Sequence, residues 1–256
     1  MSDPVLDQLR QEIDRVDDEI HDLLMRRADL GEQVAAAKDN GAPGQPRFRP
    51  GREARILRRL KSRHNGPLPF SVVGHIWREV ISSFLRRQSD LEVMVWGGAS
   101  RISVWDLARA HFGVAAPFQV TLEAVEALDK TVKADNAVAV LAFETEGEPW
   151  WRLLSDDRPG AGLQIIARLP FFENAPADAF VVGKAREDSG DDTTLVMLHD
   201  LPKPPPGALD EAAGDALIAV PGFLVDGDDA IAALSADHGA ARATVIGGYA
   251  NPIPAN

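Results

Sequence analysis

The fold of this chain is decided by residues 5–38, which read VLDQLRQEIDRVDDEIHDLLMRRADLGEQVAAAK. Apolar residues recur there at steps of three and four, and they are Leu6, Leu9, Ile13, Val16, Ile20, Leu23, Leu24, Leu30 and Val34. This spacing places them on one face of an α-helix. The sequence therefore predicts one long helix with an apolar stripe along its whole length.

Two cations interrupt this stripe. At about 100° per residue, Arg27 lies in line with Ile20 and Val34. Lys38 is rotated from Arg27 by only about 20°, whereas Arg10 lies about 25 Å down the axis. A single cation on an apolar face usually keeps its stem buried and its head group in water. Two cations in line favour instead a site for an anionic ligand.

The composition narrows the possible functions. The chain has 256 residues with 45% hydrophobic content, enough for two modest domains, and it has no cysteine. Disulfides, thiol nucleophiles and cysteine metal sites are therefore excluded. The first residues, MSDPVLDQLRQE, do not resemble a signal peptide, and no apolar run approaches a membrane span. We expect a soluble, cytoplasmic protein that does not bind membranes.

The charge is distributed unevenly along the chain. Residues 1–90 carry 16 Lys and Arg against 14 Asp and Glu, whereas the remainder carries 11 against 25. The acidic half argues against a nucleic-acid surface. The basic cluster between Arg47 and Arg63 has only Phe48 as an interleaved aromatic residue, so we expect no nucleic-acid partner. The six histidines are scattered without metal-ligand spacing, so no metal site is expected.

Two shorter helices follow the long one. Gly and Pro residues between 41 and 50 end the first helix, and the next helix is predicted over about 51–63. HNGPLP ends this second helix, and Ser71 is a suitable N-cap for a third over about 72–88. The third helix is expected to turn inward its apolar residues Val73, Ile76, Trp77, Val80, Ile81, Phe84 and Leu85. The N-terminal domain is therefore predicted to be all-α, with three helices.

The length of the first helix predicts a dimer. Two short helices cannot cover the whole stripe, and a second copy of the chain is the simplest partner, which gives an intertwined dimer. Arg10 is too far along the axis to meet a small ligand between Arg27 and Lys38 of its own chain. In an antiparallel dimer, Arg10 of the partner subunit would reach that ligand.

After residue 90 the pattern changes to short apolar runs that alternate with helices, which is typical of an α/β domain. Strands are predicted at 91–96, 118–120, 136–143, 163–169, 179–183 and 193–198. Helices are predicted near 104–111 and at 121–132, the latter with Thr121 as N-cap. A Pro-rich connection at 200–209 leads to a tail that is read as strand, helix and strand. We therefore expect a smaller α/β domain at the C-terminus.

The first ninety residues resemble the AroQ class of helical chorismate mutases. The resemblance rests on LRQEIDRVDDEIHDLLMRR, on Lys38 at the end of the first helix, on RPGREARIL and on IWREVISSFLRRQ. It implies an isomerase that converts chorismate to prephenate in aromatic amino acid biosynthesis, on the shikimate pathway. It also implies a homodimer whose active sites are shared between subunits.

The resemblance assigns roles to particular residues. It implies catalytic roles for Lys38, Gln88 and Arg27, and substrate binding by Arg10, Arg27, Lys38, Arg52, Glu53 and Gln88. The rearrangement is intramolecular and pericyclic, so the enzyme needs neither a nucleophile nor a cofactor. It must hold the reactive conformer and stabilise the charge that grows on the ether oxygen. Arginine suits the substrate carboxylates because its planar group binds them bidentately.

In this assignment Arg27 and the partner's Arg10 bind carboxylates, and Lys38 and Gln88 donate to the ether oxygen. Glu53 accepts a hydrogen bond from the ring hydroxyl, and Arg52 helps to set the charge of the site. Plainer interpretations remain open: Arg52 and Glu53 could form an ordinary solvated helix start, and Gln88 could lie in a frayed helix end.

Two residues depart from the family pattern. Arg49 stands near a position where some family members have an acidic residue, so no role is assigned to it. Phe84 stands where a small or hydroxyl residue is common, and would narrow the site beside Gln88.

The C-terminal half resembles, more weakly, the dehydratase and ACT regions of bifunctional proteins that join this mutase to a prephenate dehydratase. The resemblance rests on residues 93–113, 125–154, 179–198 and 243–252. The Thr-Arg-Phe signature of the dehydratase is absent, since the chain reads Asp178-Ala179-Phe180. Too few residues lie between Phe172 and Ala179 for a second lobe. We expect a degenerate, non-catalytic module, with regulation, dimer support and partner docking as its open roles.

These expectations divide the chain into a mutase domain (1–90), a degenerate dehydratase-like region (91–201) and an ACT-like tail (202–256). Three alternatives remain: an isochorismate pyruvate-lyase of the same fold, a catalytically inactive protein that binds an aromatic metabolite, and a full mutase–dehydratase. The pair Trp150-Trp151 could form an aromatic ligand wall, but such a pair more often belongs to a core or an interface.

Overall fold

The computed structural model describes residues 3–39, 48–88, 90–98, 101–143, 148–155, 157–172 and 179–254, without the side chains of 35, 38, 39, 86–88 and 101. The chain divides into two compact units, with the boundary between residues 45 and 46. Each unit is described by itself.

The first unit consists of helix α1 (Pro4–Asp39), which has 36 residues and confirms the long helix that the sequence predicts. Its length is about 54 Å at ~1.5 Å per residue. The apolar stripe is not buried within the unit, since Ile13 is 59%, Leu23 is 63% and Val34 is 51% exposed. Such a row of half-exposed apolar side chains is the feature that a second helical partner would bury.

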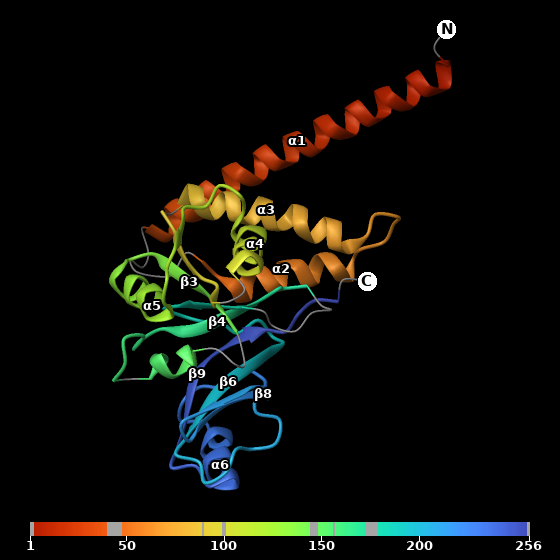
Figure 1. Cartoon of the computed structure of the whole chain (residues 1–256). Coiled ribbons are helices and arrows are strands. Elements are labelled where there is room, and N and C mark those ends of the chain that lie inside the picture. The colour runs from red at the N-terminus through yellow and green to blue at the C-terminus, as the bar shows by residue number, and fades with distance from the viewer. Residues whose placement is uncertain are drawn as a thin grey trace. The chain divides into compact units, whose positions relative to one another are not determined.

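The second unit begins with helices α2 (Pro50–Ser62) and α3 (Phe70–Gln88), whose bounds lie within two residues of those predicted. Both helices belong to the same compact unit as the C-terminal sheet (Figure 1). The three predicted helices are therefore present, but α2 and α3 pack with the sheet as one unit.

A single mixed sheet of nine strands forms the rest of this unit, in the order β2-β1-β3-β5-β4-β9-β6-β8-β7. The strands are β1 (Glu92–Trp96), β2 (Phe118–Val120), β3 (Ala137–Ala142), β4 (Gln164–Leu169), β5 (Ala179–Gly183), β6 (Asp192–His199), β7 (Asp210–Ala212), β8 (Asp215–Pro221) and β9 (Arg242–Ala250). The pairs β1–β2, β1–β3 and β4–β9 are parallel, and the other pairs are antiparallel. The α/β class predicted for this half is confirmed, but the expected smaller size is wrong, since the sheet lies in the larger of the two units.

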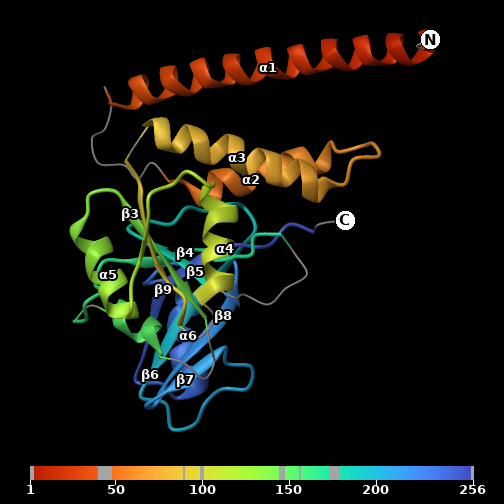
Figure 2. The same ribbon diagram turned by 45° about the horizontal axis from the view of Figure 1, so that its top comes forward.

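Helices cover both faces of the sheet near its parallel end. Helix α4 (Arg101–Phe112) connects β1 to β2, and helix α5 (Ala124–Lys133) connects β2 back to β3. The two crossovers run in opposite directions along the sheet, so right-handed connections place the helices on opposite faces, as Figure 2 shows. Helix α6 (Asp229–His238) packs on β9 at the other end.

The two ends of the sheet join where β4 pairs with β9, through Ile165 and Gly247. Gly247 has a φ of 139°, and a Cβ there would lie 2.2 Å from the Ile165 carbonyl oxygen. Only glycine fits such a close approach. This contact pairs β4, from the predicted dehydratase-like region, with β9, from the predicted ACT-like tail, so strands of both regions belong to one sheet. The separate origins of the two regions remain a prediction.

Both predicted N-caps are wrong. Helix α3 begins at Phe70, so Ser71 lies inside it, and the Pro69 carbonyl accepts from Val72 N at 3.0 Å. Helix α5 begins after Glu123, whereas the buried Thr121 donates its backbone N–H to the Val95 carbonyl at 2.9 Å. Ser71 is thus a residue of the helix itself, and Thr121 lies before the α5 N-cap and bonds to β1 instead.

Two short elements were not predicted: the 3-10 helix η2 (Trp150–Leu154) and strand β7. The side chains of Trp150 and Trp151 are only 2% and 1% exposed, which confirms that the pair belongs to the core. Trp150 Nε1 donates to the Ala142 carbonyl at 2.7 Å, and Trp151 Nε1 donates to Asp210 Oδ2 at 2.8 Å. None of the helices in the described part of the chain is both long and apolar enough to cross a membrane.

Helix α3 turns inward only part of the face that the sequence predicts: Leu85 is buried as predicted, but other buried positions differ. Gly74, Arg78 and Ser82, which follow one another at steps of four, are buried, whereas Ile76 is 49% exposed. A Cβ at Gly74 would lie 2.3 Å from Cζ of Phe172, so the Phe172 ring occupies the space that a side chain would need. The apolar side that the sequence predicts is therefore left partly open in this unit.

Candidate functional site

The start of helix α2 carries two of the residues that the resemblance assigns to substrate binding. Pro50 occupies the first turn, where its missing N–H costs nothing. The helix buries Glu53, Ala54 and Leu57, and leaves Arg52 exposed. Glu53 is therefore a carboxylate on the inward face of a helix rather than part of a solvated helix start.

Glu53 forms a buried ion pair with Arg78 of α3, in which Arg78 Nη1 donates to Glu53 Oε2. The two residues are 6% and 4% exposed. The Arg78 guanidinium also lies over the Phe171 ring, 4.8 Å from its centroid. A charge as deeply buried as this is stable only with a partner, which Glu53 and Arg78 provide for one another.

The environment of Glu53 shifts the pKa of its carboxyl upward. Burial raises the pKa of the Glu53 carboxyl above its ordinary value, the charge of Arg78 and its hydrogen bond act against this, and the charge of Glu187 adds to the rise. Glu187 lies on the connection between β5 and β6. A residue of the C-terminal half therefore influences the pKa of this carboxyl.

His111 of α4 is also buried beside this pair. Its pKa lies well below the usual value because of its burial and, second, because of the charge of Arg78. The ring packs between Phe48 and Phe112, at centroid distances of 5.9 and 4.8 Å. Among the described residues, neither His111 Nε2 nor Arg78 Nε has a hydrogen-bond partner. The arrangement keeps His111 neutral beside a fixed positive charge.

The other predicted site residues lie on α1 or at the end of α3. Arg10 is exposed and pairs with Asp7 at 3.4 Å, and Arg27 is half-buried within the first unit. The side chains of Lys38 and Gln88 lie outside the described residues. Arg52 and Glu53 are sequence neighbours on α2, where Arg52 is exposed and Glu53 is buried. The assembly of all six residues into one site remains a prediction.

Two residues of this region were missed by the sequence analysis. Arg78 and Glu187 lie 25 and 134 positions from Glu53 along the chain, so no local pattern connects them to it. One signal was available for Glu187. It lies in the acidic stretch AREDSGDD of the negatively charged half, and the α2 stretch RPGREARILRRLK is strongly basic.

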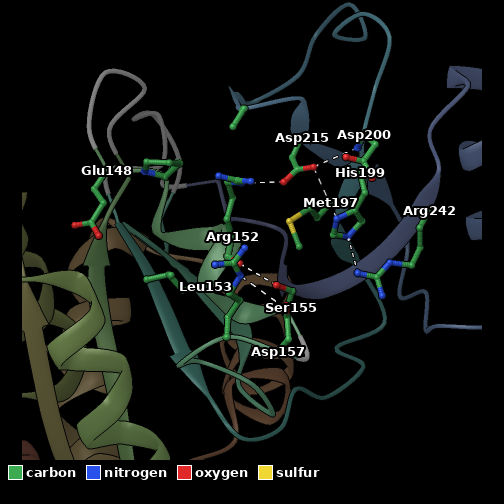
Figure 3. Close-up of a pocket in the computed structure, with 13 residues that line it drawn as sticks. Glu148, Arg152, Leu153, Ser155, Asp157, Met197, His199, Asp200, Asp215 and Arg242 are labelled. Atoms are coloured by element: carbon green, nitrogen blue, oxygen red, sulfur yellow. Dashed lines mark hydrogen bonds and ion pairs between the residues drawn. The ribbon is translucent and has the colours of Figure 1, made fainter.

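A cavity with a volume of about 360 Å³ lies elsewhere in the same unit (Figure 3). Asp215 accepts there from Arg152 Nε at 2.8 Å and from the backbone of Asp200 at 3.2 Å. His199 Nε2 lies 3.1 Å from Thr244 Oγ1, and burial is the main reason why the pKa of His199 is lowered. None of the predicted site residues lines this cavity.

Comparison with known proteins connects the helical region to one family. Residues 9–89 match the family model described as chorismate mutase type II. The bifunctional chorismate mutase/prephenate dehydratase of Neisseria gonorrhoeae is 33% identical over 147 residues, which cover 57% of this chain and 39% of that protein. The protein of the same description from Aquifex aeolicus is 32% identical over 148 residues, which cover 56% of this chain and 40% of that protein.

The chain therefore spans about 40% of the length of these relatives. The alignment to the first of these proteins has 147 residues, whereas the chain has only 89 residues up to the end of the family match. The similarity therefore continues into the C-terminal half. Among solved structures, GqqA, described as a novel type of quorum quenching acylase, matches with a TM-score of 0.44 and 15% identity, over 63% of this chain and 95% of that chain. A prephenate dehydratase from Streptococcus mutans matches with a TM-score of 0.38 and 14% identity, over 63% and 99%. These two likenesses are too low to support a conclusion.

Proposed function

We propose that this protein is a chorismate mutase, an isomerase that converts chorismate to prephenate in aromatic amino acid biosynthesis. The observation that carries the proposal is the family match over residues 9–89, which contains all six residues that the sequence analysis assigns to the site. The 33% identity to a bifunctional mutase–dehydratase supports the same reaction.

The six residues suit a reaction that needs binding and charge stabilisation alone. Arg27 and the partner's Arg10 would hold the two carboxylates of the substrate in the chair-like reactive conformer. Lys38 and Gln88 would donate to the ether oxygen, whose negative charge grows as its bond to carbon breaks. Glu53 would accept from the ring hydroxyl, and Arg52 would add positive charge beside it.

A homodimer follows from the same helix. The apolar stripe of α1 is exposed in the single chain, and Leu9, Ile13 and Ile20 each have about half or more of their surface open, at 56%, 59% and 51%. Pairing of two copies would bury this stripe and would bring Arg10 of the partner subunit to the site. The proposed site is then incomplete in one chain.

The C-terminal sheet is proposed to be a non-catalytic module, derived from a dehydratase and an ACT region. Strands β4 and β5 are antiparallel neighbours, and Leu169 lies opposite Ala179. The short connection between these two adjacent positions supports the absence of a second lobe, which the dehydratase reaction needs for its cleft. A regulatory role for the module, and a cytoplasmic location for the protein, remain predictions from the sequence.

The direct test is to incubate the purified full chain with chorismate and to identify the product by chromatography and mass spectrometry. The proposal predicts prephenate. Isochorismate, offered in parallel, distinguishes the pyruvate-lyase alternative, and prephenate offered as substrate tests for phenylpyruvate. Failure to form prephenate from chorismate would exclude the proposed reaction.

One observation favours a second candidate, a catalytically inactive protein that binds an aromatic metabolite. The Glu53 carboxyl is buried and already paired with Arg78, so it is not open to a substrate hydroxyl in the single chain. Calorimetry with chorismate and prephenate would show binding without turnover in that case. Turnover that is lost in Lys38→Ala would exclude the binding-only interpretation.

A further inference from the structure

The start of helix α2 lacks a cap of its own. Its N-cap residue is Arg49, which forms no capping hydrogen bond through its side chain. An arginine has donors only, whereas the first N–H groups of a helix need an acceptor. This helix start carries Arg52 and Glu53, so whatever caps it also fixes two proposed site residues.

The missing acceptor comes from the connection between β5 and β6. Glu187 Oε2 accepts from the Arg52 backbone N–H at 3.3 Å, the contact that an N-cap side chain normally provides. Glu187 Oε1 accepts from Arg49 Nε in an ion pair. A carboxylate at a helix N-terminus is also favoured by the helix dipole.

The fit between this connection and α2 is close. A Cβ at Gly51 would lie 2.8 Å from the carbonyl oxygen and 2.9 Å from the Cβ of Glu187. Any larger residue at position 51 would therefore push the loop away from the helix. The glycine thus allows the backbone of Glu187 to rest directly on the first turn of α2.

A second set of contacts holds the same loop further along α2. Arg58 Nη1 donates to the carbonyl and the hydroxyl of Ser189 at 3.0 and 2.9 Å. Arg58 Nη2 donates to the carbonyls of Asp191 and Asn251 at 2.7 and 3.1 Å. The buried Asp192 holds the loop in turn, since it accepts from the backbone and hydroxyl of Ser189 at 2.8 and 2.7 Å. Through Arg58, helix α2 is thus bonded to the loop between β5 and β6 and to Asn251, which follows β9.

We propose that residues 187–191, here called the capping loop, position the mutase site: the loop caps α2 through Glu187, is anchored by Arg58, and so fixes Arg52 and Glu53 without touching substrate. The inference rests on the proposed function. It gives the C-terminal sheet a part in the mutase reaction, because β5 and β6 hold the loop in place. Glu187 and Arg58 are positioning residues.

The charge of Glu187 supplies a signature that a merely structural contact would not give. Because this charge contributes to the raised pKa of Glu53, its removal lowers that pKa. The acidic limb of the pH profile of kcat/KM, where it reports ionisation of Glu53, then moves to lower pH in Glu187→Gln. Glu187→Asp keeps the charge, so the limb stays near its wild-type position while the shorter side chain caps less well.

The experiment compares the full-chain variants Glu187→Gln, Glu187→Asp and Arg58→Ala with Arg59→Ala, the exposed neighbour of Arg58 on the same helix. Initial rates of prephenate formation are measured against chorismate concentration and pH, and thermal melting checks the folded state. We expect kcat/KM to fall about tenfold in Glu187→Gln and Arg58→Ala, mainly through a higher KM, since small displacements of positioning groups cost this much or more. Arg59→Ala is expected to stay within about twofold of wild type.

The inference is overturned if Glu187→Gln and Arg58→Ala behave like Arg59→Ala in a wild-type background that makes prephenate, and the proposed function then stands. It is also overturned if the variants lose activity only in proportion to a loss of folded protein, with no shift of the acidic limb. A wild-type chain that makes no prephenate removes the proposed function and this inference together. If Arg58→Ala does not fold, the comparison of Glu187→Gln with Glu187→Asp decides.

Discussion

Helices α1 and α2 each carry residues proposed for the same site, but the chain holds them in opposite ways. Helix α1 is a unit by itself, with its apolar stripe exposed and Arg10 in an exposed pair with Asp7. Helix α2 is capped by Glu187 and anchored through Arg58, and it buries Glu53 against Arg78. The difference motivates two separate proposals, pairing of α1 with a second copy of the chain and support of α2 by the C-terminal sheet.

The largest effect is expected from a charge in the α1 stripe. Ile13→Asp would place a carboxylate in the apolar contact between two copies, where an unpaired charge is very costly. We expect a monomer by sedimentation velocity and no detectable prephenate formation. Gln11→Asp, about 160° around the helix, is the matched control and should remain a dimer. A dimeric, active Ile13→Asp would show that α1 does not form the interface.

The next largest effect is expected from breaking the ion pair between Glu53 of α2 and Arg78 of α3. Arg78→Met leaves the Glu53 carboxyl buried without its partner, and breaking such a pair costs about 3–5 kcal/mol of unfolding free energy. Urea unfolding of the full chain measures this loss. The double variant Glu53→Gln, Arg78→Met removes both charges and is expected to recover most of the stability. Equal losses in the single and double variants would mean that the loss in Arg78→Met does not come from the unpaired Glu53 carboxylate.

A third effect concerns the proposed chemistry on α1. Lys38→Ala removes a donor to the ether oxygen, and loss of one such donor lowers kcat by about 10²–10³-fold. Steady-state kinetics with chorismate measures it. Arg26→Ala removes an exposed cation from the same helix and should leave kcat within about twofold. A Lys38→Ala enzyme with normal kcat would refute the role assigned to this lysine.

The smallest effect is a dependence of stability on pH. His111 is neutral when folded because its pKa lies well below 6.5, whereas the unfolded chain binds a proton there below about pH 6.5. Stability from this residue is therefore present above that pH and falls as the pH drops, by up to about 1.4 kcal/mol per pH unit. Urea unfolding of His111→Phe over the same pH range should show a shallower decline. An unchanged slope would contradict this explanation.

The sequence predicted the regular elements well, because each carries its own periodicity. The stripe of α1 and the apolar runs of β3 and β5 are local signals, and the observed bounds follow them closely. The caps at Ser71 and Thr121 were predicted wrongly because α3 begins one residue before Ser71 and because Thr121 bonds to Val95 of β1, which is distant along the chain. Strand β7 reads Asp-Glu-Ala and lacks the large apolar residues that mark β2, which is equally short.

The inward face of α3 also could not be predicted fully from local periodicity. Periodicity favours Ile76 and its apolar neighbours, but the buried face carries Gly74 and Arg78. Phe172 and Glu53 occupy that side, and both come from other parts of the chain. For the site, the sequence motif of α2 pointed to Arg52 and Glu53. Arg78 and Glu187, which contact these two residues, lie far away along the chain, so no local pattern connects them.

The requirement for a second copy can be tested by mixing two inactive variants. Arg10→Ala and Lys38→Ala each damage both sites of their own homodimer, but a mixed dimer contains one intact site, formed by Lys38 of one chain and Arg10 of the other. Random mixing gives one intact site in about four, so chorismate turnover should return to about a quarter of the wild-type rate. Recovery to that level supports a site shared between subunits. A mixture no more active than its two components would contradict it.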